Sequence, residues 1–260
     1  MSSDDVLLFR REGAVGVVTL NRPEVRNALD VALMDALRAL WSDRERLAGL
    51  RCLVLTGAGK GFCSGADVSL LNTDRADAKA TAADELAFLP GPQVAIPVIV
   101  AVNGVCAGGG LHFVADADIV IAGEHASFLD PHVTVGQVTA LEPLTLLPRV
   151  RFDAIARMAL LGASERLDAA RALDAGLVSE VVPDADLLPR ALELAGRIAA
   201  NSPRAVQESR RALRLVEERL LSGLLDEGWA AIRAHWDHPD ATEGPAAFLE
   251  KREPRWEEPG

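Results

Sequence analysis

Short apolar runs, separated by polar loops, recur along the first half of the chain. Two of them, at residues 6–9 and 15–20, flank a Glu12-Gly13 turn, which is the pattern of paired β-strands. Further buried strands are predicted where β-branched and leucine residues cluster, at residues 52–55, 97–102, 119–122 and 126–129.

Helical spacing of apolar residues separates these strands and then dominates the chain. It predicts a helix over residues 30–47 with Asp30 as its N-cap. Further helices are predicted over residues 152–161, 165–175, 186–200, 203–221 and 224–235. Strands that alternate with helices, followed by helices alone, are typical of an α/β fold with a helical C-terminal part. Ser202-Pro203 divides a core of residues 1–201 from a helical region of residues 202–260.

Composition favours a packed protein that handles small molecules. Of the 260 residues, 49% are apolar, which is enough to bury one sizeable core. Aromatic residues make up 4% and the formal net charge is -11, so no nucleic-acid partner is expected. The longest apolar run, at residues 94–102, contains Pro97 and is too short to span a bilayer, so no membrane partner is expected.

Two further features indicate a cytoplasmic location. The acidic N-terminus shows no secretory pattern. Cys52, Cys63 and Cys106 are odd in number and lack C-x-x-C spacing, which is typical of reduced thiols.

Two glycine-rich loops follow predicted strands, where α/β proteins place ligand sites. Neither loop matches a nucleotide-binding pattern, because Phe62 and Phe113 stand where a third glycine is required and Lys60 is followed by glycine. One remaining interpretation is that both loops are only tight turns. The other is an oxyanion hole, in which amides at the start of the helix after Gly108 act together with an amide of the Ser64-Gly-Ala-Asp turn.

Several motifs give the chain a family resemblance that extends from about residue 6 to residue 255. In order, and at family-like spacing, they are Asn21-Arg-Pro-Glu-Val-Arg-Asn-Ala-Leu29, Leu53-Val-Leu-Thr-Gly57, Phe62-Cys-Ser-Gly-Ala-Asp67, Ala101-Val-Asn-Gly104 with Ala107-Gly-Gly-Gly110, Leu147-Pro-Arg149 and the Lys251-Arg-Glu-Pro tail. On these motifs the sequence resembles the enoyl-CoA hydratase/isomerase (crotonase) family. The resemblance implies a spiral of ββα repeats with a C-terminal helical region that trimerises, so we expect a homotrimer or homohexamer.

The resemblance also assigns binding residues to an acyl-CoA thioester. It implies that the oxyanion amides are those of Ala66 and Gly109. The coenzyme A part of the substrate is expected against residues 26–28, which include Arg26, Asn27 and Ala28, and against residues 66–69, which include Asp67 and Val68. Arg26 is the candidate for the coenzyme A phosphates, with a solvated surface arginine as the alternative. Residues 73–89 are expected to shape the acyl pocket, and no cofactor beyond coenzyme A itself is implied.

The chain departs from the family pattern at both acid/base positions. The hydratase branch has Glu two residues after the glycine run and a second Glu twenty residues later, whereas His112 and His132 stand here. Imidazole titrates near neutrality, so one ring can act as base while the other carries a proton. We expect His112, near a helix N-terminus, to be the neutral base, and His132, near Asp130, to be the acid. The alternative is that both are bystanders.

Glu142 is a third candidate acid, because some branches of the family place one along this loop, and a surface carboxylate is the equal alternative. No metal site is expected, because His235 and His238 have no third ligand nearby in the sequence. Three functions follow from these residues. The first is acyl-CoA chemistry through a stabilised enolate, with hydration of a 2-enoyl-CoA as the default. The others are a β-diketone-type carbon–carbon bond hydrolase and a non-catalytic acyl-CoA-binding protein.

Overall fold

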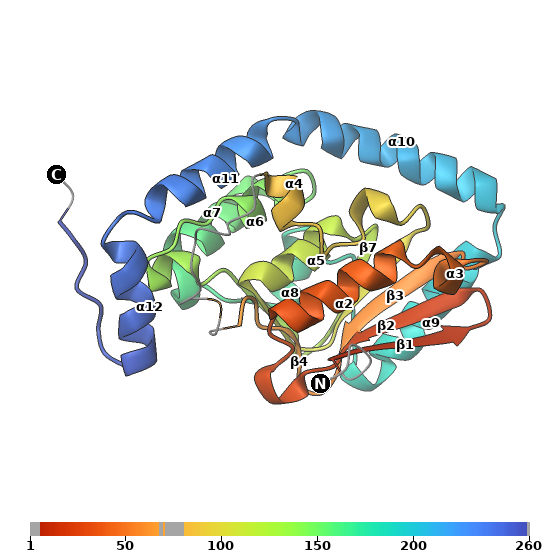
Figure 1. Cartoon of the computed structure of the whole chain (residues 1–260). Coiled ribbons are helices and arrows are strands. Elements are labelled where there is room, and N and C mark those ends of the chain that lie inside the picture. The colour runs from red at the N-terminus through yellow and green to blue at the C-terminus, as the bar shows by residue number, and fades with distance from the viewer. Residues whose placement is uncertain (1–5, 68–69, 71–80, 259–260) are drawn as a thin grey trace.

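Two β-sheets form the framework of the computed structural model, which describes residues 6–67, 70 and 81–258 (Figure 1). The large sheet has the order β1-β2-β3-β5-β7-β10 and the small sheet the order β4-β6-β8-β9. The strands of the large sheet are β1 (Leu7–Glu12), β2 (Val15–Leu20), β3 (Cys52–Gly57), β5 (Val98–Val102), β7 (Ile119–Gly123) and β10 (Glu180–Val182). Those of the small sheet are β4 (Gly61–Cys63), β6 (Val105–Ala107), β8 (Ser127–Leu129) and β9 (Leu167–Asp168).

The order of these strands shows a repeating unit. Each of β3, β5 and β7 lies in the large sheet, and the strand that follows it along the chain lies in the small sheet. Strands β2, β3, β5, β7 and β10 run parallel, while β1 pairs with β2 in antiparallel fashion. This winding confirms the α/β fold of the crotonase type that the sequence predicts.

Helices cover the sheets and continue beyond them. The α-helices are α2 (Val31–Ser42), α3 (Arg44–Leu47), α4 (Ala82–Glu85), α5 (Leu111–Asp116), α6 (Leu141–Leu146), α7 (Phe152–Leu161), α8 (Ala169–Asp174), α9 (Leu187–Ala199), α10 (Pro203–Leu221), α11 (Leu224–His235) and α12 (Asp240–Glu250). The 3-10 turns are η1 (Pro23–Val25), η4 (Gly91–Gln93), η5 (Gly108–Gly110), η6 (His132–Val135), η7 (Gly162–Ser164) and η8 (Asp184–Asp186).

Both faces of the large sheet are buried, because successive residues of its strands point to opposite sides. On one face Val18 and Leu55 pack with Leu37 of α2. On the other face Val17 and Val54 pack against α9, whose Ala191 and Ala195 are fully buried, together with Leu187. Strands that are buried on both faces therefore need apolar residues at successive positions. These continuous apolar runs make the strands recognisable in the sequence.

Two predicted helices have different bounds in the structure. The helix predicted over residues 30–47 begins as expected, with the Asp30 side chain accepting a hydrogen bond from the Leu33 amide. It ends at Ser42, because Asp43 leaves helical geometry and caps the separate helix α3. The helix predicted over residues 165–175 is also wrong in its first part. There β9 pairs with β8, and Asp168 caps the shorter helix α8.

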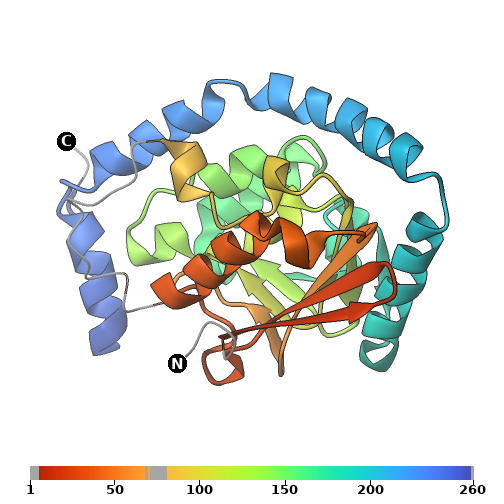
Figure 2. The ribbon, with the colours of Figure 1, turned by 45° about the vertical axis from the view of Figure 1, so that its right-hand side comes forward.

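The C-terminal helices curve around the outside of the core (Figures 1 and 2). Helix α10 has no buried residue, whereas α11 buries Trp229 against Leu141 of α6. Helix α12 packs on η6, where Gly244 approaches Val135 closely. Within the described ranges, none of the helices combines the length and apolarity that crossing a bilayer requires.

Candidate active site

Two backbone amides, those of Ala66 and Gly109, lie close to each other. Ala66 forms an isolated parallel bridge with Leu29, in which the Leu29 amide donates to Gly65 and the Asp67 amide donates to Leu29. This pattern directs the Ala66 amide away from Leu29, because amides alternate sides along an extended chain. A methyl group placed on Gly109 would lie 3.8 Å from the Ala66 nitrogen.

Glycines make this approach sterically possible. Gly65 has φ +90 and Gly108 has φ +47, a region that disfavours residues with a Cβ. The amide of Gly109 is in the first turn of η5, where helical amides have no intrahelical acceptor. The two predicted oxyanion amides, of Ala66 and Gly109, thus lie together and can point at one oxygen.

The first histidine is held by a buried carboxylate. His112 lies in the first turn of α5 and is 6% exposed. Its Nε2 lies 3.1 Å from Oε1 of Glu142, which comes from α6 and is 5% exposed. The other ring nitrogen, Nδ1, is buried without a hydrogen-bond partner in the described part of the chain. When Nε2 donates to the carboxylate, Nδ1 carries a free lone pair.

The second histidine lies beside the glycine turn. The Nδ1 atom of His132 is 2.6 Å from Oδ1 of Asp130, and its Nε2 is 3.7 Å from Oε1 of Glu142. A methyl group placed on Gly108 would lie 3.3 Å from Cε1 of His132, so the ring packs against the turn that carries the oxyanion amide. The Thr139 hydroxyl donates to the other oxygen of Asp130. We call His112, Asp130, His132 and Glu142 the imidazole cluster.

The charged groups of the imidazole cluster shift one another's pKa values toward the charged forms. Burial alone would lower the pKa of His132, but the carboxylates of Glu142 and Asp130 raise it to about 9. Burial would raise the pKa of Glu142, yet His132 and His112 hold it well below its usual range. At neutral pH the cluster therefore contains an imidazolium beside an ionised carboxylate.

These positions decide one of the sequence alternatives. Glu142 is buried between the two histidines, so the surface-carboxylate alternative is wrong. Asp130, His132 and Glu142 also offer ligand atoms within 4.8 Å of one another.

The expected coenzyme A residues lie around η1. Arg26 is exposed and has φ 52, and Ala28 is buried. The Asp67 carboxylate lies 3.0 Å from Nη1 of Arg22, which also contacts Asp30 at 2.9 Å. This ion pair gives Asp67 a structural role in holding the Ala66 turn. Val68 lies outside the described residues.

Asn27, which belongs to the segment expected to line the coenzyme A part, supports the η1 turn from inside the protein. Its side-chain amide donates to the carbonyls of Gly61 and Phe62, and its oxygen accepts from the Arg22 amide. It is fully buried and ties the η1 turn to the strand that leads to Ala66. In the sequence, the only indication of this role is that the Asn stands inside a motif that resembles the family. A buried polar side chain requires fixed hydrogen-bond partners.

A cavity of about 920 Å³ opens beside the imidazole cluster. His112 lies in its wall, together with Asp116 one helical turn further along α5. The opposite walls come from α4, η4 and the inner side of α10. Of the residues 73–89 predicted to shape an acyl pocket, the described part from residue 81 onward does line this cavity, and residues 73–80 lie outside the described ranges.

Comparison with known proteins shows to which family the chain belongs. The family model for enoyl-CoA hydratase/isomerase matches residues 10–259. A mevalonyl-coenzyme A hydratase of Aspergillus fumigatus is 37% identical over 249 residues, covering 92% of this chain and 90% of that protein. The chain belongs to the enoyl-CoA hydratase/isomerase family. It is therefore an acyl-CoA-processing enzyme of that family.

Other similar proteins show that family membership does not by itself fix the reaction. A 1,2-epoxyphenylacetyl-CoA isomerase of Escherichia coli is 34% identical and covers 97% of this chain and 98% of that protein. The crystal structure of a carnitinyl-CoA hydratase from Mycobacterium avium is similar, with a TM-score of 0.86, 32% identity, and coverage of 97% of this chain and 98% of that chain. Hydratases and an isomerase are thus comparably similar, so the reaction must be inferred from the imidazole cluster.

Proposed function

We propose that this protein adds water to a 2-enoyl-CoA through an oxyanion-stabilised enolate. The observation that carries the proposal is the imidazole cluster beside the paired amides of Ala66 and Gly109. One histidine has a free nitrogen and a carboxylate partner, and the other is protonated between two carboxylates. The site therefore contains both a base and an acid, as hydration requires.

The proton transfers of this reaction balance within the imidazole cluster. His112 takes a proton from water while the water oxygen bonds to C3 of the enoyl group. The electron pair of the C2–C3 double bond moves to the thioester oxygen, where the amides of Ala66 and Gly109 stabilise the negative charge. His132 then donates its proton to C2. Transfer of the proton from His112 to His132 across Glu142 restores the starting state.

The coenzyme A part of the substrate is assigned to the η1 side of the paired amides. Arg26 is the exposed cation of this side and would contact the phosphates, while the backbone around Ala28 and Asp67 would line the chain. Replacing Arg26 with Ala should weaken coenzyme A binding in calorimetry and leave the bound turnover rate unchanged.

Loss of the conjugated absorbance of enoyl thioesters tests the hydration directly. Crotonyl-CoA, 2-octenoyl-CoA and cinnamoyl-CoA would be incubated with the purified protein, with Glu142→Gln as the matched inactive variant. We expect absorbance to fall with at least one of them and the product to be the 3-hydroxyacyl-CoA. If none is hydrated while octanoyl-CoA still binds in calorimetry, the hydration proposal is wrong, and a carbon–carbon bond hydrolase or a non-catalytic binder remains.

The contact between His112 and Glu142 also favours a second candidate, a carbon–carbon bond hydrolase. A histidine with a carboxylate at one nitrogen and a free second nitrogen is suited to activate water for attack on a carbonyl. The paired amides would then stabilise the leaving enolate. Incubation with cyclic β-diketones should give a ring-opened acid if this candidate holds, and recovery of unchanged diketone would exclude it.

A homotrimer or homohexamer is proposed from the surface of the C-terminal helices. Large apolar side chains of α10 and α11 remain exposed, among them Leu213, Val216, Leu220 and Leu224. Exposed apolar residues gathered on one element favour an interface between copies. Trp229 of α11, in contrast, is already buried within its own chain. Light scattering should give a multiple of 27.6 kDa, and a monomer at micromolar concentration would exclude the proposal.

A further inference from the structure

The turn that carries His132 has little support of its own. It is the 3-10 turn η6, which is four residues long and ends at Gly136 with φ 64. Fixing the backbone of a single turn costs conformational entropy for only a few hydrogen bonds, so an isolated turn is unstable. The position of the His132 ring therefore depends on the elements that pack against η6.

Two helices of the C-terminal region bond the residues that end this turn. Nε2 of His235, the last residue of α11, lies 2.9 Å from the carbonyl oxygen of Gly136. The side-chain amide of Gln137 donates to the carbonyl of Ala241 in α12, over 2.9 Å. The main-chain amide of Gln137 in turn donates to the carbonyl of His132, so α12 is connected to the histidine through one residue.

Helix α12 also lies main chain against main chain with η6 at two points. A methyl group placed on Gly244 of α12 would overlap the carbonyl oxygen of Val135. One placed on Gly136 would overlap the carbonyl oxygen of Asp240 and lie 2.8 Å from the Trp256 ring. Neither position can hold a larger residue unless the two main chains move apart. A displacement of α12 would therefore move η6 directly.

The His132 ring makes contacts that tolerate little movement. Its Nδ1 lies 2.6 Å from Oδ1 of Asp130, and its Nε2 lies 3.7 Å from Oε1 of Glu142. A charge-assisted hydrogen bond weakens steeply when its donor moves away or turns. In addition, a proton donor must lie within hydrogen-bond reach of the atom that it protonates. A small shift of η6 would thus affect both the pairing of His132 and its reach.

We propose that α11 and α12 position His132 for proton transfer, with His235 and Gly244 as the positioning residues. His235 acts through the carbonyl of Gly136, and Gly244 acts by allowing α12 to lie directly on η6. The inference rests on the proposed function in taking His132 as the acid. It gives the C-terminal helices a part in catalysis that is separate from contacts between copies of the chain.

Replacement of Gly244 with alanine tests the contact between α12 and η6. The added methyl group should displace η6. We expect kcat for the hydrated enoyl-CoA to fall about tenfold with KM unchanged, because misplaced catalytic groups lose rate sharply. Gly196→Ala in α9 is the matched control, since a methyl group there meets no atom within 4 Å and should leave kcat at the parent value. Equal kcat in Gly244→Ala and the parent would overturn the role of Gly244.

A proton resonance of the His132 ring reports its position without turnover. The short bond from Nδ1 to Asp130 should give a nitrogen-bound proton far downfield in spectra of protein with isotopically labelled histidine, and His132→Gln should lack it. In Gly244→Ala we expect this resonance to move upfield, whereas in Gly196→Ala it should stay in place. An unchanged resonance in Gly244→Ala would overturn the proposal, because His132 would not have moved.

His235 is tested by two substitutions of different hydrogen-bonding capacity. His235→Leu removes the donor to Gly136 and should lower kcat severalfold, with KM unchanged, and move the same resonance upfield. His235→Gln retains a donor and should restore most of both values. Equal loss in the two variants, or no loss in either, would overturn the role of His235.

These two variants of His235 decide the matter if Gly244→Ala does not fold. The resonance also separates this inference from the proposed function. If no enoyl-CoA is hydrated but the resonance moves as expected in the variants, the positioning of His132 stands and the proposed function alone is refuted. If hydration is observed and the resonance does not move, the inference alone is refuted.

Discussion

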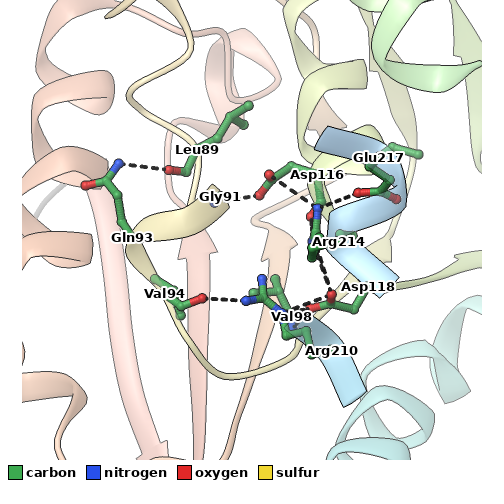
Figure 3. Close-up of polar contacts among 12 residues, drawn as sticks. Leu89, Gly91, Gln93, Val94, Val98, Asp116, Asp118, Arg210, Arg214 and Glu217 are labelled. Carbon is green, nitrogen blue, oxygen red and sulfur yellow. Dashed lines mark hydrogen bonds and ion pairs between the residues drawn. The ribbon is translucent and has the colours of Figure 1, made fainter. Parts of the chain in front are cut away.

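The two ends of α5 carry two buried ionic clusters that differ in one chemical property. At its beginning, the imidazole cluster holds its positive charge on an imidazole ring, which can give up its proton. At its end, Asp116, Asp118 and Glu217 pair with Arg210 and Arg214 (Figure 3). This guanidinium cluster holds its positive charge on arginines, which stay protonated. Similar burial and similar ion pairs therefore suit different tasks. The first cluster can exchange protons with a substrate, and the second can only position groups and fix the chain.

The largest expected effect concerns stability in the guanidinium cluster. Arg214→Met would leave Asp116 and Asp118 buried with one cation fewer, and breaking a buried ion pair costs about 3–5 kcal/mol. Urea unfolding should show a loss of about 3 kcal/mol in the free energy of unfolding. Arg211→Met is the matched control, since Arg211 is 74% exposed and should change stability by less than about 0.5 kcal/mol. Equal losses in both variants would show that α10 is not anchored as described.

The next effect concerns turnover in the imidazole cluster. His132→Ala removes the proposed acid, so we expect turnover to fall by about a hundredfold, the usual contribution of a positioned acid. Binding of the coenzyme A part should change little, because His132 does not lie near η1. His125→Ala is the control, with a side chain that is 78% exposed and paired with Asp184. Full activity in His132→Ala would make that imidazole a bystander.

The next effect is the pH dependence of the free energy of unfolding, which should distinguish the imidazole cluster from the guanidinium cluster. His132 has a pKa of about 9 in the folded protein and about 6.5 when unfolded, so its contribution is complete below pH 6.5 and is lost as pH rises through 9. We expect the free energy of unfolding to fall by on the order of 2 kcal/mol between pH 6.5 and 9.5. In His132→Gln most of this fall should disappear. An unchanged fall in that variant would place the responsible titration elsewhere.

The smallest effect concerns the support of His132. Thr139→Val removes the hydroxyl that donates to Asp130 and should lower the free energy of unfolding by about 1 kcal/mol. Turnover should fall severalfold, less than in His132→Ala. Thr145→Val is the control for stability, because the Thr145 hydroxyl bonds only carbonyls of its own helix. A loss in Thr139→Val no greater than in this control would mean that Asp130 does not need the hydroxyl.

The sequence predicts the large sheet except β10, whereas of the small sheet it predicts only β8, at residues 126–129. Strands such as β3 and β5 are buried on both faces, and this leaves continuous apolar runs. The strands β4, β6 and β9 are two or three residues long, too short for any periodicity. Their positions follow from pairing with neighbours that are distant along the chain, which local patterns do not record.

The candidate site was predictable only in part. The paired amides and the two histidines follow from motif positions, but the meaning of Glu142 does not, since an acidic residue in a loop is most often solvated. Its burial between the two imidazoles depends on how α6 packs against α5. Asp116 was missed for the same reason. Burial raises its pKa to about 6 against the opposing effect of Arg214, an environment that only the tertiary structure creates.

The groups that face one another across Ala66 and Gly109 belong to the main chain, whereas every acid or base nearby belongs to a side chain. A point substitution can replace a side chain but cannot remove a peptide N–H, except through proline. During the evolution of such a protein, substitutions would therefore exchange the proton-transfer side chains. Stabilisation of a charged intermediate by main-chain amides would be kept. On this view the two histidines are an exchange of proton-transfer groups made without rebuilding the backbone, and related chains could differ in chemistry while sharing one enolate.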